Sequence, residues 1–521
     1  MRVCRCLAMA LWVGGLLGCG ADDEGPGPGG SGGGGTSPTP AEPPTAGARQ
    51  QPCAPSEREL DGACMPAGVP EDGCGEGFTH RDAGCDAVLP AQACPDGELA
   101  LMGETSCRPV APCGTGPWGD IPVDATTIYV DQAHAGPSDG SSSQPFTTLT
   151  AALAAAQPGD LIAVAPGTYS GHAVLDQPVR LWGKCPAEVT LTASAVPDAT
   201  VLVTASNVEV HTLSVSGADF GIGVDGALDV VLDRVWVHDT GGVGVQVQTL
   251  AGPASLTVRD SLIESATLHG LFDLGGAVTV ERSVVRETRP GTDGTLGRGI
   301  TAREPSGAVD RTSLALDRVL LEDLHEYGVR GSATVMTIDD SLIRRVVPQS
   351  SDQVAGIGIE VRGSISTGLL GEAVVRGTVV EQVSEEGIVA KNAELHVERT
   401  VVRNVAEAAP DAGGTSNGIR VQATQEVADA TAHLTLTESL VERTVHRGVR
   451  VDDGVFDLTG VVVRDVEVDG LGEFGIGVSI SGSVERSTGT IAGLLAERLV
   501  GIGVFVQGSD VDAQSVMVRD V

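Results

Sequence analysis

The sequence predicts an all-β protein in which a small disulfide-rich module precedes a long right-handed parallel β-helix with an N-terminal capping helix. Three observations favour this fold class. From Ala125 to Val521, short segments of alternating apolar and polar residues recur, such as VRDSLI, VERSVV and VERTVV. Neighbouring segments are 22 residues apart in every second interval, and a glycine holds a fixed place within the 22-residue units. Alternation indicates a strand with one buried face, and a constant period near 22 residues indicates one solenoid coil per repeat.

Residues 1–18 are a predicted lipoprotein signal peptide. Arg2 and Arg5 supply a positive start, and Leu7–Leu17 is an apolar run too short to span a bilayer. The run ends in Leu-Leu-Gly-Cys at Cys19, which resembles the lipobox of bacterial lipoproteins. This resemblance implies cleavage before Cys19, acylation of its thiol and anchoring at the bacterial envelope, on the outer membrane or cell surface. The alternative is an ordinary signal peptide with a chance cysteine.

Residues 19–49 are a predicted tether, because Gly, Pro, Ser, Thr and Ala dominate them and such a composition cannot bury a core. A flexible segment after a lipid anchor would hold a folded domain away from the membrane. The chain as a whole carries 33 Lys and Arg against 69 Asp and Glu, a net charge of −36. Nucleic acid is therefore excluded as a partner, since phosphate contacts require a basic surface.

Residues 50–120 are rich in Gly, Pro and Cys and lack hydrophobic periodicity, which predicts a loop-rich module held by disulfides. Eight cysteines follow the anchor, and an even number in an exported chain favours disulfides over metal. These are Cys53, Cys64, Cys74, Cys85, Cys94, Cys107, Cys113 and Cys185. Seven lie in the module, so Cys185 is expected to bond to one of them and to clamp the module onto the first coils. The sequence leaves the other pairings open.

Residues 121–521 form the predicted β-helix. TTIYV at 126–130 is a strand, residues 146–160 are a helix ended by Pro and Gly, and LIAVAPGTY at 161–169 is a strand and turn. This order resembles the N-terminal end of bacterial β-helix proteins of the pectate-lyase-like superfamily. The resemblance implies that the helix covers the open end of the first coil, whose unpaired backbone groups would otherwise be exposed.

Each repeat is marked by an anchor, the residue before its apolar pair or triplet. The anchors are Thr212, Arg234, Asp260, Arg282, Arg318, Asp340, Gly377, Arg399, Glu438, Gly460, Arg498 and Asp520. Spacings of 22 alternate with spacings of 26 to 39. In the short coils the fixed glycine is Gly270, Gly328, Gly387 or Gly448, and in the long coils Gly299, Gly356, Gly418 or Gly475. We expect these glycines to supply a backbone angle that other residues resist.

The long coils carry insertions on both sides of one strand, which predicts the two walls of a groove. The alternative is that turns tolerate insertions or that a two-coil unit was duplicated. The strand between the insertions presents outward Arg303, Arg330, Glu360, Lys391, Arg420, Gln422, Arg450 and Asp452. Four arginines and a lysine on one face of an acidic protein indicate a strip for an anionic ligand such as an acidic polysaccharide. The alternative is a solvated ladder of paired charges.

No catalytic constellation is evident. Of the motifs by which polygalacturonase-type hydrolases resemble one another, the chain has only aspartate pairs, Asp339-Asp340 and Asp452-Asp453. Asp452 beside Arg450 imitates the calcium site of pectate lyases only weakly, so no cofactor or metal is assigned. Asp273 falls on an inward position unless the register slips there. Surface positions are expected for His238, His269, His325, His396 and His446.

Aromatic residues form only 3% of the chain, which disfavours a processive carbohydrate enzyme because sugar rings stack on aromatic side chains. The sequence therefore favours a non-catalytic surface protein that serves adhesion or polysaccharide binding. The alternative is a polysaccharide lyase or glycoside hydrolase acting on an acidic polysaccharide. The sequence stops one residue after an anchor, which predicts an uncapped C-terminal coil on which a partner or another copy of the chain docks. The alternative is that the sequence is cut short there.

Overall fold

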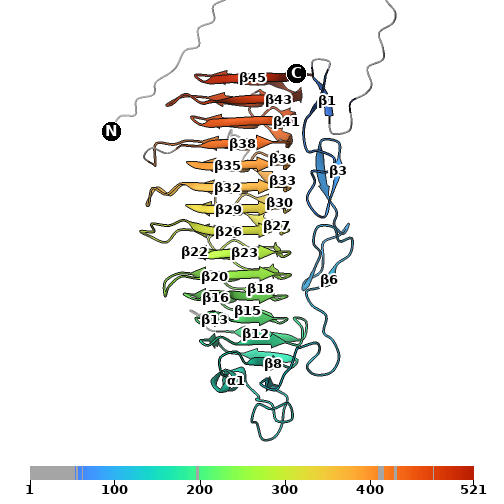
Figure 1. Cartoon of the computed structure of the whole chain (residues 1–521), viewed down its shortest axis with the longest axis vertical. Coiled ribbons are helices and arrows are strands. Elements are labelled where there is room, and N and C mark those ends of the chain that lie inside the picture. Colours follow the sequence, from blue (N-terminus) through green and yellow to red (C-terminus); the bar gives the residue numbers. More distant parts are fainter. Residues whose placement is uncertain are drawn as a thin grey trace, which may run out of the picture. The chain divides into compact units, whose positions relative to one another are not determined.

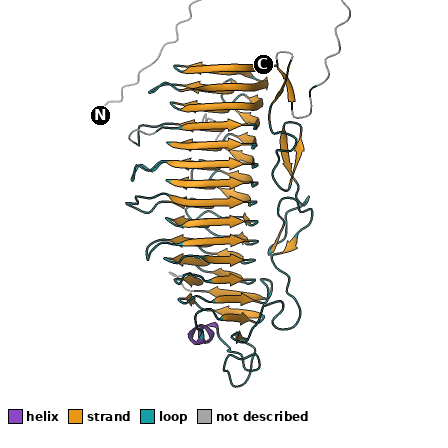
Figure 2. Ribbon diagram, viewed as in Figure 1, coloured by secondary structure: helices purple, strands orange, loops and turns teal. Residues whose placement is uncertain are grey.

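Parallel strands stack into two long sheets and form the predicted β-helix (Figures 1 and 2). The computed structural model describes residues 53, 57–60, 63–194, 199–408, 416–427, 431–472 and 474–521. The predicted signal peptide, Cys19 and the tether lie outside the described residues. Cys53–Val521 forms one unit. Within the described part of this unit, no helix has the length and apolar character needed to cross a membrane.

Each coil places one strand in a 13-stranded sheet and, in most coils, two consecutive strands in a 26-stranded sheet. The smaller sheet contains β10 (Ala173–Leu175), β13 (Val201–Val203), β16 (Ile222–Asp225), β19 (Val245–Gln248), β22 (His269–Leu274), β25 (Arg298–Arg303), β28 (Tyr327–Ser332), β31 (Ile357–Arg362), β34 (Glu386–Lys391), β37 (Asn417–Gln422), β40 (Arg447–Asp452), β42 (Gly475–Ser481) and β44 (Gly501–Gln507).

The larger sheet contains β7 (Ile128–Val130), β8 (Leu161–Val164), β9 (Gly167–Ser170), β11 (Arg180–Gly183), β12 (Val189–Ala193), β14 (Glu209–His211), β15 (Ser214–Gly217), β17 (Val230–Asp233), β18 (Trp236–Thr240), β20 (Ser255–Arg259), β21 (Leu262–Glu264), β23 (Ala277–Glu281), β24 (Val284–Arg286), β26 (Thr312–Asp317), β27 (Leu320–His325), β29 (Thr334–Asp339), β30 (Leu342–Val347), β32 (Gly371–Arg376), β33 (Val379–Ser384), β35 (Ala393–Glu398), β36 (Val401–Ala406), β38 (His433–Thr437), β39 (Leu440–Val445), β41 (Val455–Glu467), β43 (Thr488–Leu499) and β45 (Asp510–Arg519).

A short helix, α1 (Leu149–Ala155), lies at the start of the coils, as the sequence predicted. The Thr148 side chain accepts a hydrogen bond from the Ala151 N–H and caps the helix. Leu149 and Ala152 are buried in the core of the first coils. The helix is shorter than the predicted 146–160, because a cap precedes Leu149 and the chain turns extended at Ala156.

Apolar residues of successive coils stack in register inside the helix. Leu271, Ile300 and Val329 are paired positions of β22, β25 and β28, and each is fully buried. Because side chains alternate across a strand, every second residue joins this core and the residues between them face outward. The continuous core is made largely of valine, leucine and isoleucine.

The anchors from Thr212 to Gly460 all have a left-handed backbone, with φ between 41° and 64°. Those from Thr212 to Glu438 separate two consecutive strands of the larger sheet, whereas Gly460 lies inside the continuous strand β41. The last two anchors are wrong by five residues. The strand register places Gly493 and Ser515 opposite Gly460, whereas Arg498 and Asp520 belong to a second left-handed column. In both columns every second spacing is 22 residues, so this spacing alone did not distinguish them.

A glycine ladder starts the strands of the smaller sheet, but its role differs from the expectation. None of its members has a positive φ. Instead, a Cβ on Gly387 would lie 2.4 Å from the Gly418 carbonyl oxygen of the next coil, and the same contact recurs along the ladder. Close approach between coils therefore requires glycine here. Two positions also shift, since Gly358 and Gly477, rather than Gly356 and Gly475, stand in the ladder.

The cysteine-rich segment lies lengthwise along the larger sheet (Figure 1). It contains three antiparallel hairpins, formed by β1 (Glu57–Leu60) and β2 (Ala63–Pro66), β3 (Phe78–Arg81) and β4 (Gly84–Ala87), and β5 (Glu98–Leu99) and β6 (Arg108–Pro109). The disulfides are Cys53–Cys64, Cys74–Cys85, Cys94–Cys107 and Cys113–Cys185. Cys185 thus bonds to a cysteine of the module, as its odd cysteine count led us to expect.

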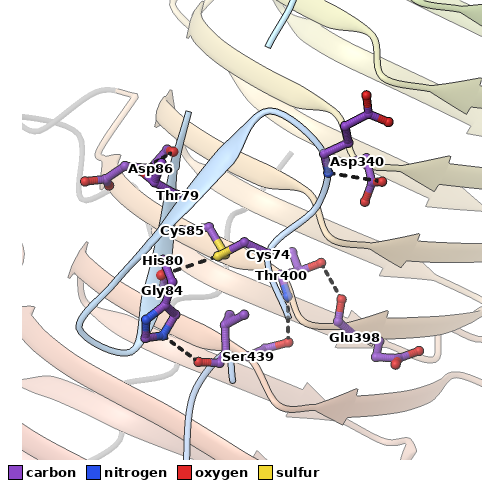
Figure 3. The surroundings of a disulfide bond; sticks show 12 residues. Cys74, Thr79, His80, Gly84, Cys85, Asp86, Asp340, Glu398, Thr400 and Ser439 are labelled. Carbon is purple, nitrogen blue, oxygen red and sulfur yellow. Dashed lines mark hydrogen bonds between the residues drawn. A yellow bond between two sulfur atoms is a disulfide. The ribbon is translucent and has the colours of Figure 1, made fainter. Parts of the chain in front are cut away.

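We call residues 67–113 the strap. Its contacts extend much further than the first coils, because the Gly68 N–H donates to the Gly460 carbonyl at 2.8 Å. The strand β1, which precedes the strap, contacts β45. Figure 3 shows the Cys74–Cys85 disulfide of the strap against the coils that carry Asp340, Thr400 and Ser439. Under the strap lies an outward apolar column of the larger sheet: Leu262, Val284, Leu320, Leu342, Val379, Val401, Leu440, Val462 and Leu495. The strap therefore covers a stripe that would otherwise expose large apolar side chains to water.

Candidate ligand-binding cavity

The predicted outward residues all lie on the outer face of the smaller sheet, in two columns. Register pairs Thr301 with Arg330, Arg330 with Glu360 and, further along, Arg420 with Arg450. A second column contains Arg303, Ser332, Arg362, Lys391, Gln422 and Asp452. These columns alternate with buried core positions, as the pleat of a strand requires.

Four of the five predicted basic residues have an acidic partner. Arg330 Nε lies 2.8 Å from the buried carboxylate of Glu360, which Lys391 also reaches at 3.5 Å. Further along the face, Arg450 Nε lies 2.7 Å from Asp452. Arg420 lies 3.5 Å from Asp452, 3.3 Å from Glu386 and donates to Gln422 at 2.7 Å. Over this stretch the alternative of a paired charge ladder describes the face correctly.

Arg303 and Arg362 differ from these residues. Neither has an acidic partner within 4.0 Å among the residues that the structure describes. The Arg303 side chain is exposed and that of Arg362 is half-buried. Both stand in the same column with Ser332 between them. Arg362 was missed in the sequence because placing Gly356 in the glycine ladder ended the expected strand at Glu360.

Both arginines line a cavity of about 460 Å³ over β22, β25, β28 and β31. Arg298 and Arg330 contribute to its floor. Leu296, from the insertion before β25, forms one side, and Ser364, Ile365 and Ser366, from the insertion after β31, form the other. Insertions on both sides of the strand therefore wall this part of the face, in the arrangement that the repeat spacing predicted.

Three buried polar side chains of the cavity lack partners in the described part of the chain. They are His269 at 7% exposed, Thr301 at 3% and Glu304 at 4%, through Nδ1, Oγ1 and Oε2 respectively. Unpaired buried polar groups are uncommon in folded proteins, and each requires an explanation such as a missing ligand or water. Burial, with the nearby charges of Arg298 and Arg330, lowers the pKa of His269 to about 3, so its imidazole is neutral near pH 7.

The expectation of surface histidines is wrong for His269 and also for His446, which is buried. His269 stands on β22 at the position that pairs with Arg298 on β25, so it belongs to the cavity rather than to the solvent. Both residues lie where a strand of the smaller sheet begins, His269 as the first residue of β22 and His446 directly before β40.

Tyr327 fixes two of the cavity arginines. The Arg298 and Arg330 guanidinium carbons lie 5.0 Å and 4.6 Å from the centre of its ring. Such stacking is attractive because the ring face carries negative charge density. Arg298 is also held by Glu326 at 2.7 Å. Burial raises the pKa of Tyr327 to about 12, with Glu360 adding to the effect, so the phenol stays protonated.

Asp273 does point inward, and the register does not slip there. It is fully buried between Val247 and Ala302 in a core column of the smaller sheet. Its Oδ1 accepts a hydrogen bond from the Gly276 N–H at 2.8 Å. Burial raises the pKa of this carboxyl to about 7. Asp273 is thus a core residue and does not face the cavity.

The paired aspartates have structural partners. Asp339 bonds to Arg376 at 2.9 Å, and Asp340 accepts from the Glu76 N–H of the strap. Asp453 accepts from the backbone of Ser483, Val484 and Glu485. In the described ranges, the group with metal-ligand spacing is Cys113, Cys185 and Glu188, whose thiols form a disulfide and offer no thiolate.

Comparison with known proteins finds distant likeness. A family model described as "Protein of unknown function (DUF1565)" matches residues 134–193, and no curated protein matches the chain. The Azotobacter vinelandii mannuronan C-5 epimerase AlgE6 A-module is 14% identical, with 71% of this chain and 94% of that chain covered and a TM-score of 0.43. A rhamnogalacturonan lyase is 13% identical, with 61% and 82% covered and a TM-score of 0.41.

The Dettilon tailspike protein is 9% identical, with 73% of this chain and 68% of that chain covered and a TM-score of 0.42. These three proteins are an epimerase, a lyase and a tailspike. A fold can host unrelated functions, so the function of this chain has to follow from the residues of its own site.

Proposed function

We propose that this protein is an exported envelope lipoprotein that binds an acidic polysaccharide, without catalysis, in the cavity between β22 and β31. The observation that carries the proposal is the pair Arg303 and Arg362. Both side chains line the cavity, and neither has an acidic partner among the described residues, in a chain whose net charge is −36.

The chemistry of the cavity suits a carboxylated or sulfated sugar. A guanidinium offers two parallel N–H groups that match the two oxygens of a carboxylate or sulfate. Ser332, Ser364 and Ser366 add hydroxyl groups, and Phe272 and Ile365 add apolar surface. A volume of about 460 Å³ is in the range of small-ligand sites. The unpaired Thr301 and Glu304 would gain hydrogen bonds from sugar hydroxyl groups.

Export and anchoring are part of the proposal. Four disulfides support an oxidising compartment, since such bonds persist outside the cytosol. The Leu-Leu-Gly-Cys junction supports acylation of Cys19. Replacing Cys19 with Ala is expected to move the protein from the membrane fraction to the soluble fraction. If the variant stayed in the membrane and incorporated labelled fatty acid, the anchor would lie elsewhere.

A second candidate function is a polysaccharide lyase or hydrolase that acts on an acidic polysaccharide. The observation in its favour is His269, a buried neutral imidazole with an unpaired Nδ1 in the same cavity as the arginines. A neutral imidazole can accept a proton in general base catalysis. Release of shortened or unsaturated products from a bound glycan would favour this candidate over simple binding.

A glycan array tests both candidate functions, binding and cleavage of an acidic polysaccharide. The whole chain is compared with the double variant Arg303→Gln/Arg362→Gln and with Arg376→Gln, whose arginine pairs with Asp339 on the other sheet. We expect the parent and Arg376→Gln to retain acidic glycans, and the double variant to lose them. Retention should fall with salt, because exposed charge contacts are screened over about 10 Å at 0.1 M. Equal binding by the double variant would overturn the proposal.

A further inference from the structure

Glu304 is a buried carboxylate in a cavity that is otherwise lined by arginines and uncharged residues. It follows Arg303 directly at the end of β25 and is 4% exposed. Its Oε2 accepts no hydrogen bond from the residues that the structure describes. A carboxylate without a donor is strongly disfavoured in a buried position, so this atom calls for a donor from outside the chain.

The arginines of the cavity do not supply that donor. Arg298 and Arg330 are held by other carboxylates, at 2.7 Å and 2.8 Å. Arg303 and Arg362 have no acidic partner in the described part of the chain, and therefore form no ion pair with Glu304. The cavity thus presents unpaired positive groups and an unpaired negative group at the same time. A ligand that satisfies both kinds of group carries an acidic group and a cationic group.

A metal ion, a hydroxyl group and an ammonium group are the three kinds of partner for Glu304. A metal ion such as Ca²⁺ takes roughly six to eight oxygen ligands, whereas Glu304 is the one carboxylate among the described residues of the lining. In the described ranges, the group with metal-ligand spacing lies elsewhere, at Cys113, Cys185 and Glu188. A sugar hydroxyl group would donate a hydrogen bond but leave the charge of the buried carboxylate uncompensated. An ammonium group both donates and neutralises that charge.

The acidic and cationic groups of such a ligand lie close together. Arg303 and Glu304 are consecutive in the chain, so their Cα atoms are about 3.8 Å apart. The two contacts therefore fall within one sugar or within two linked sugars. From these observations, and resting on the proposed function, we infer that the ligand is an acidic glycan with a free amino group, carried on or next to the sugar whose acidic group meets Arg303.

Acetylation of the amino group separates this class of ligand from other acidic glycans. The probes are a tetrasaccharide of glucuronate and glucosamine with free amino groups, the same tetrasaccharide after N-acetylation, and a tetragalacturonate. Affinity of the whole chain for each probe is measured by isothermal titration at about pH 6, where an amino group is protonated. We expect the free amine to bind at least about tenfold more tightly than the acetylated form, as for one hydrogen bond to a charged group. Equal or tighter binding of the acetylated form, or binding of the tetragalacturonate alone, would overturn the inference and leave the proposed function standing. Absence of binding to all three probes would overturn the two together.

Single variants provide the internal controls. Glu304→Gln keeps the size of the side chain and removes its charge, so it should weaken binding of the free amine about tenfold and leave binding of the acetylated form unchanged. Arg303→Gln should weaken both forms by a similar factor, because it removes a contact to the acidic group that they share. Glu398→Gln removes a carboxylate that pairs with Arg399 on the larger sheet and should change neither affinity. If Glu304→Gln kept the preference for the free amine, another group would recognise the amine, and the inference would be wrong.

Discussion

The guanidinium of Arg286 lies 2.5 Å from the carboxylate of Glu264, directly across two paired strands. The same relationship recurs in Arg344–Glu322, Arg403–Glu381, Arg464–Glu442 and Arg519–Glu497. Glutamate and arginine thus alternate without interruption on ten successive coils, from β21 to β45. The strap adds further partners to this ladder: Asp86 to Arg403, Asp82 to Arg464 and the Pro95 carbonyl to Arg286.

Removing one partner of a Glu–Arg pair in this ladder should lower the stability of the fold substantially. Arg286 and Glu264 are both almost fully buried, so Arg286→Met leaves a buried carboxylate without its counter-charge. Removing one partner of a buried pair costs about 3–5 kcal/mol. We expect a much lower midpoint of thermal unfolding for Arg286→Met, and substantial recovery in Glu264→Gln/Arg286→Met. The control is Arg486→Met, since the Arg486–Asp510 pair is mostly exposed and its loss should lower the unfolding midpoint far less. Equal losses in the two single variants would contradict the prediction.

The glycine ladder predicts a steric penalty separate from backbone strain. In Gly387→Ala the new Cβ meets the Gly418 carbonyl of the next coil at 2.4 Å, and neither backbone can move without disturbing the stack. In Gly368→Ala the Cβ enters open space, but the residue has a φ of 74°. We expect about 1–2 kcal/mol for Gly368→Ala from strain alone and a larger loss for Gly387→Ala, measured as unfolding midpoints. A smaller loss at position 387 would exclude close packing as the reason for glycine.

The disulfide between strap and coils should contribute more than one within the strap. Cys113 and Cys185 are 72 residues apart, and Cys94 and Cys107 are 13 apart. Loop-closure entropy gives about 4 kcal/mol for the longer loop and about 3 kcal/mol for the shorter. The double variant Cys113→Ser/Cys185→Ser should therefore unfold at a lower denaturant concentration than Cys94→Ser/Cys107→Ser. The reverse order would show that the strap is held mainly by its other contacts.

The buried carboxyl of Asp273 predicts a pH dependence of stability. Its pKa in the folded protein is raised to about 7, against about 4 in an unfolded chain. The folded state therefore holds the proton more tightly, and stability falls as the pH rises from about 4 to 7, then stays lower. Asp273→Asn cannot ionise and keeps an oxygen for the Gly276 N–H. We expect its unfolding midpoint to exceed that of the parent at pH 8, with the difference shrinking toward pH 4. A constant difference across this range would mean that Asp273 is ionised at all of these pH values.

The repeat was readable from the sequence because every coil returns the chain to the same register, so Arg234 and Asp260 occupy equivalent turns. The Glu–Arg ladder could also have been found in the sequence, since Glu264 and Arg286 each follow an anchor by four residues. Recognising it as a series of ion pairs requires placing these positions side by side in neighbouring coils. The strap was not predictable. Its contacts, such as Asp86 with Arg403, join residues 317 apart, and no period in the module indicates which coil each residue meets.

The cavity was predicted in part. The insertions and Arg303 were identified from the spacing, because both depend only on the coil period. His269, Thr301 and Glu304 were not, because burial by a neighbouring loop is not visible in the alternation of a strand. Arg362 was not predicted, because Gly356 was taken as the ladder glycine in place of Gly358. This two-residue error ended the expected strand at Glu360, before Arg362.

The path of the strap has a mechanical consequence. β1 contacts β45, while Cys113 is bonded to Cys185 near the opposite end of the stack, so the chain enters the unit beside the coil from which it leaves. Tension applied between residues 53 and 521 would load the last coil and the first hairpin, and the coils between them would carry almost no force. The stack would then yield by peeling one coil at a time from its C-terminal end, at low force, while the strap resists in shear along its whole length until the load reaches the covalent link at Cys185.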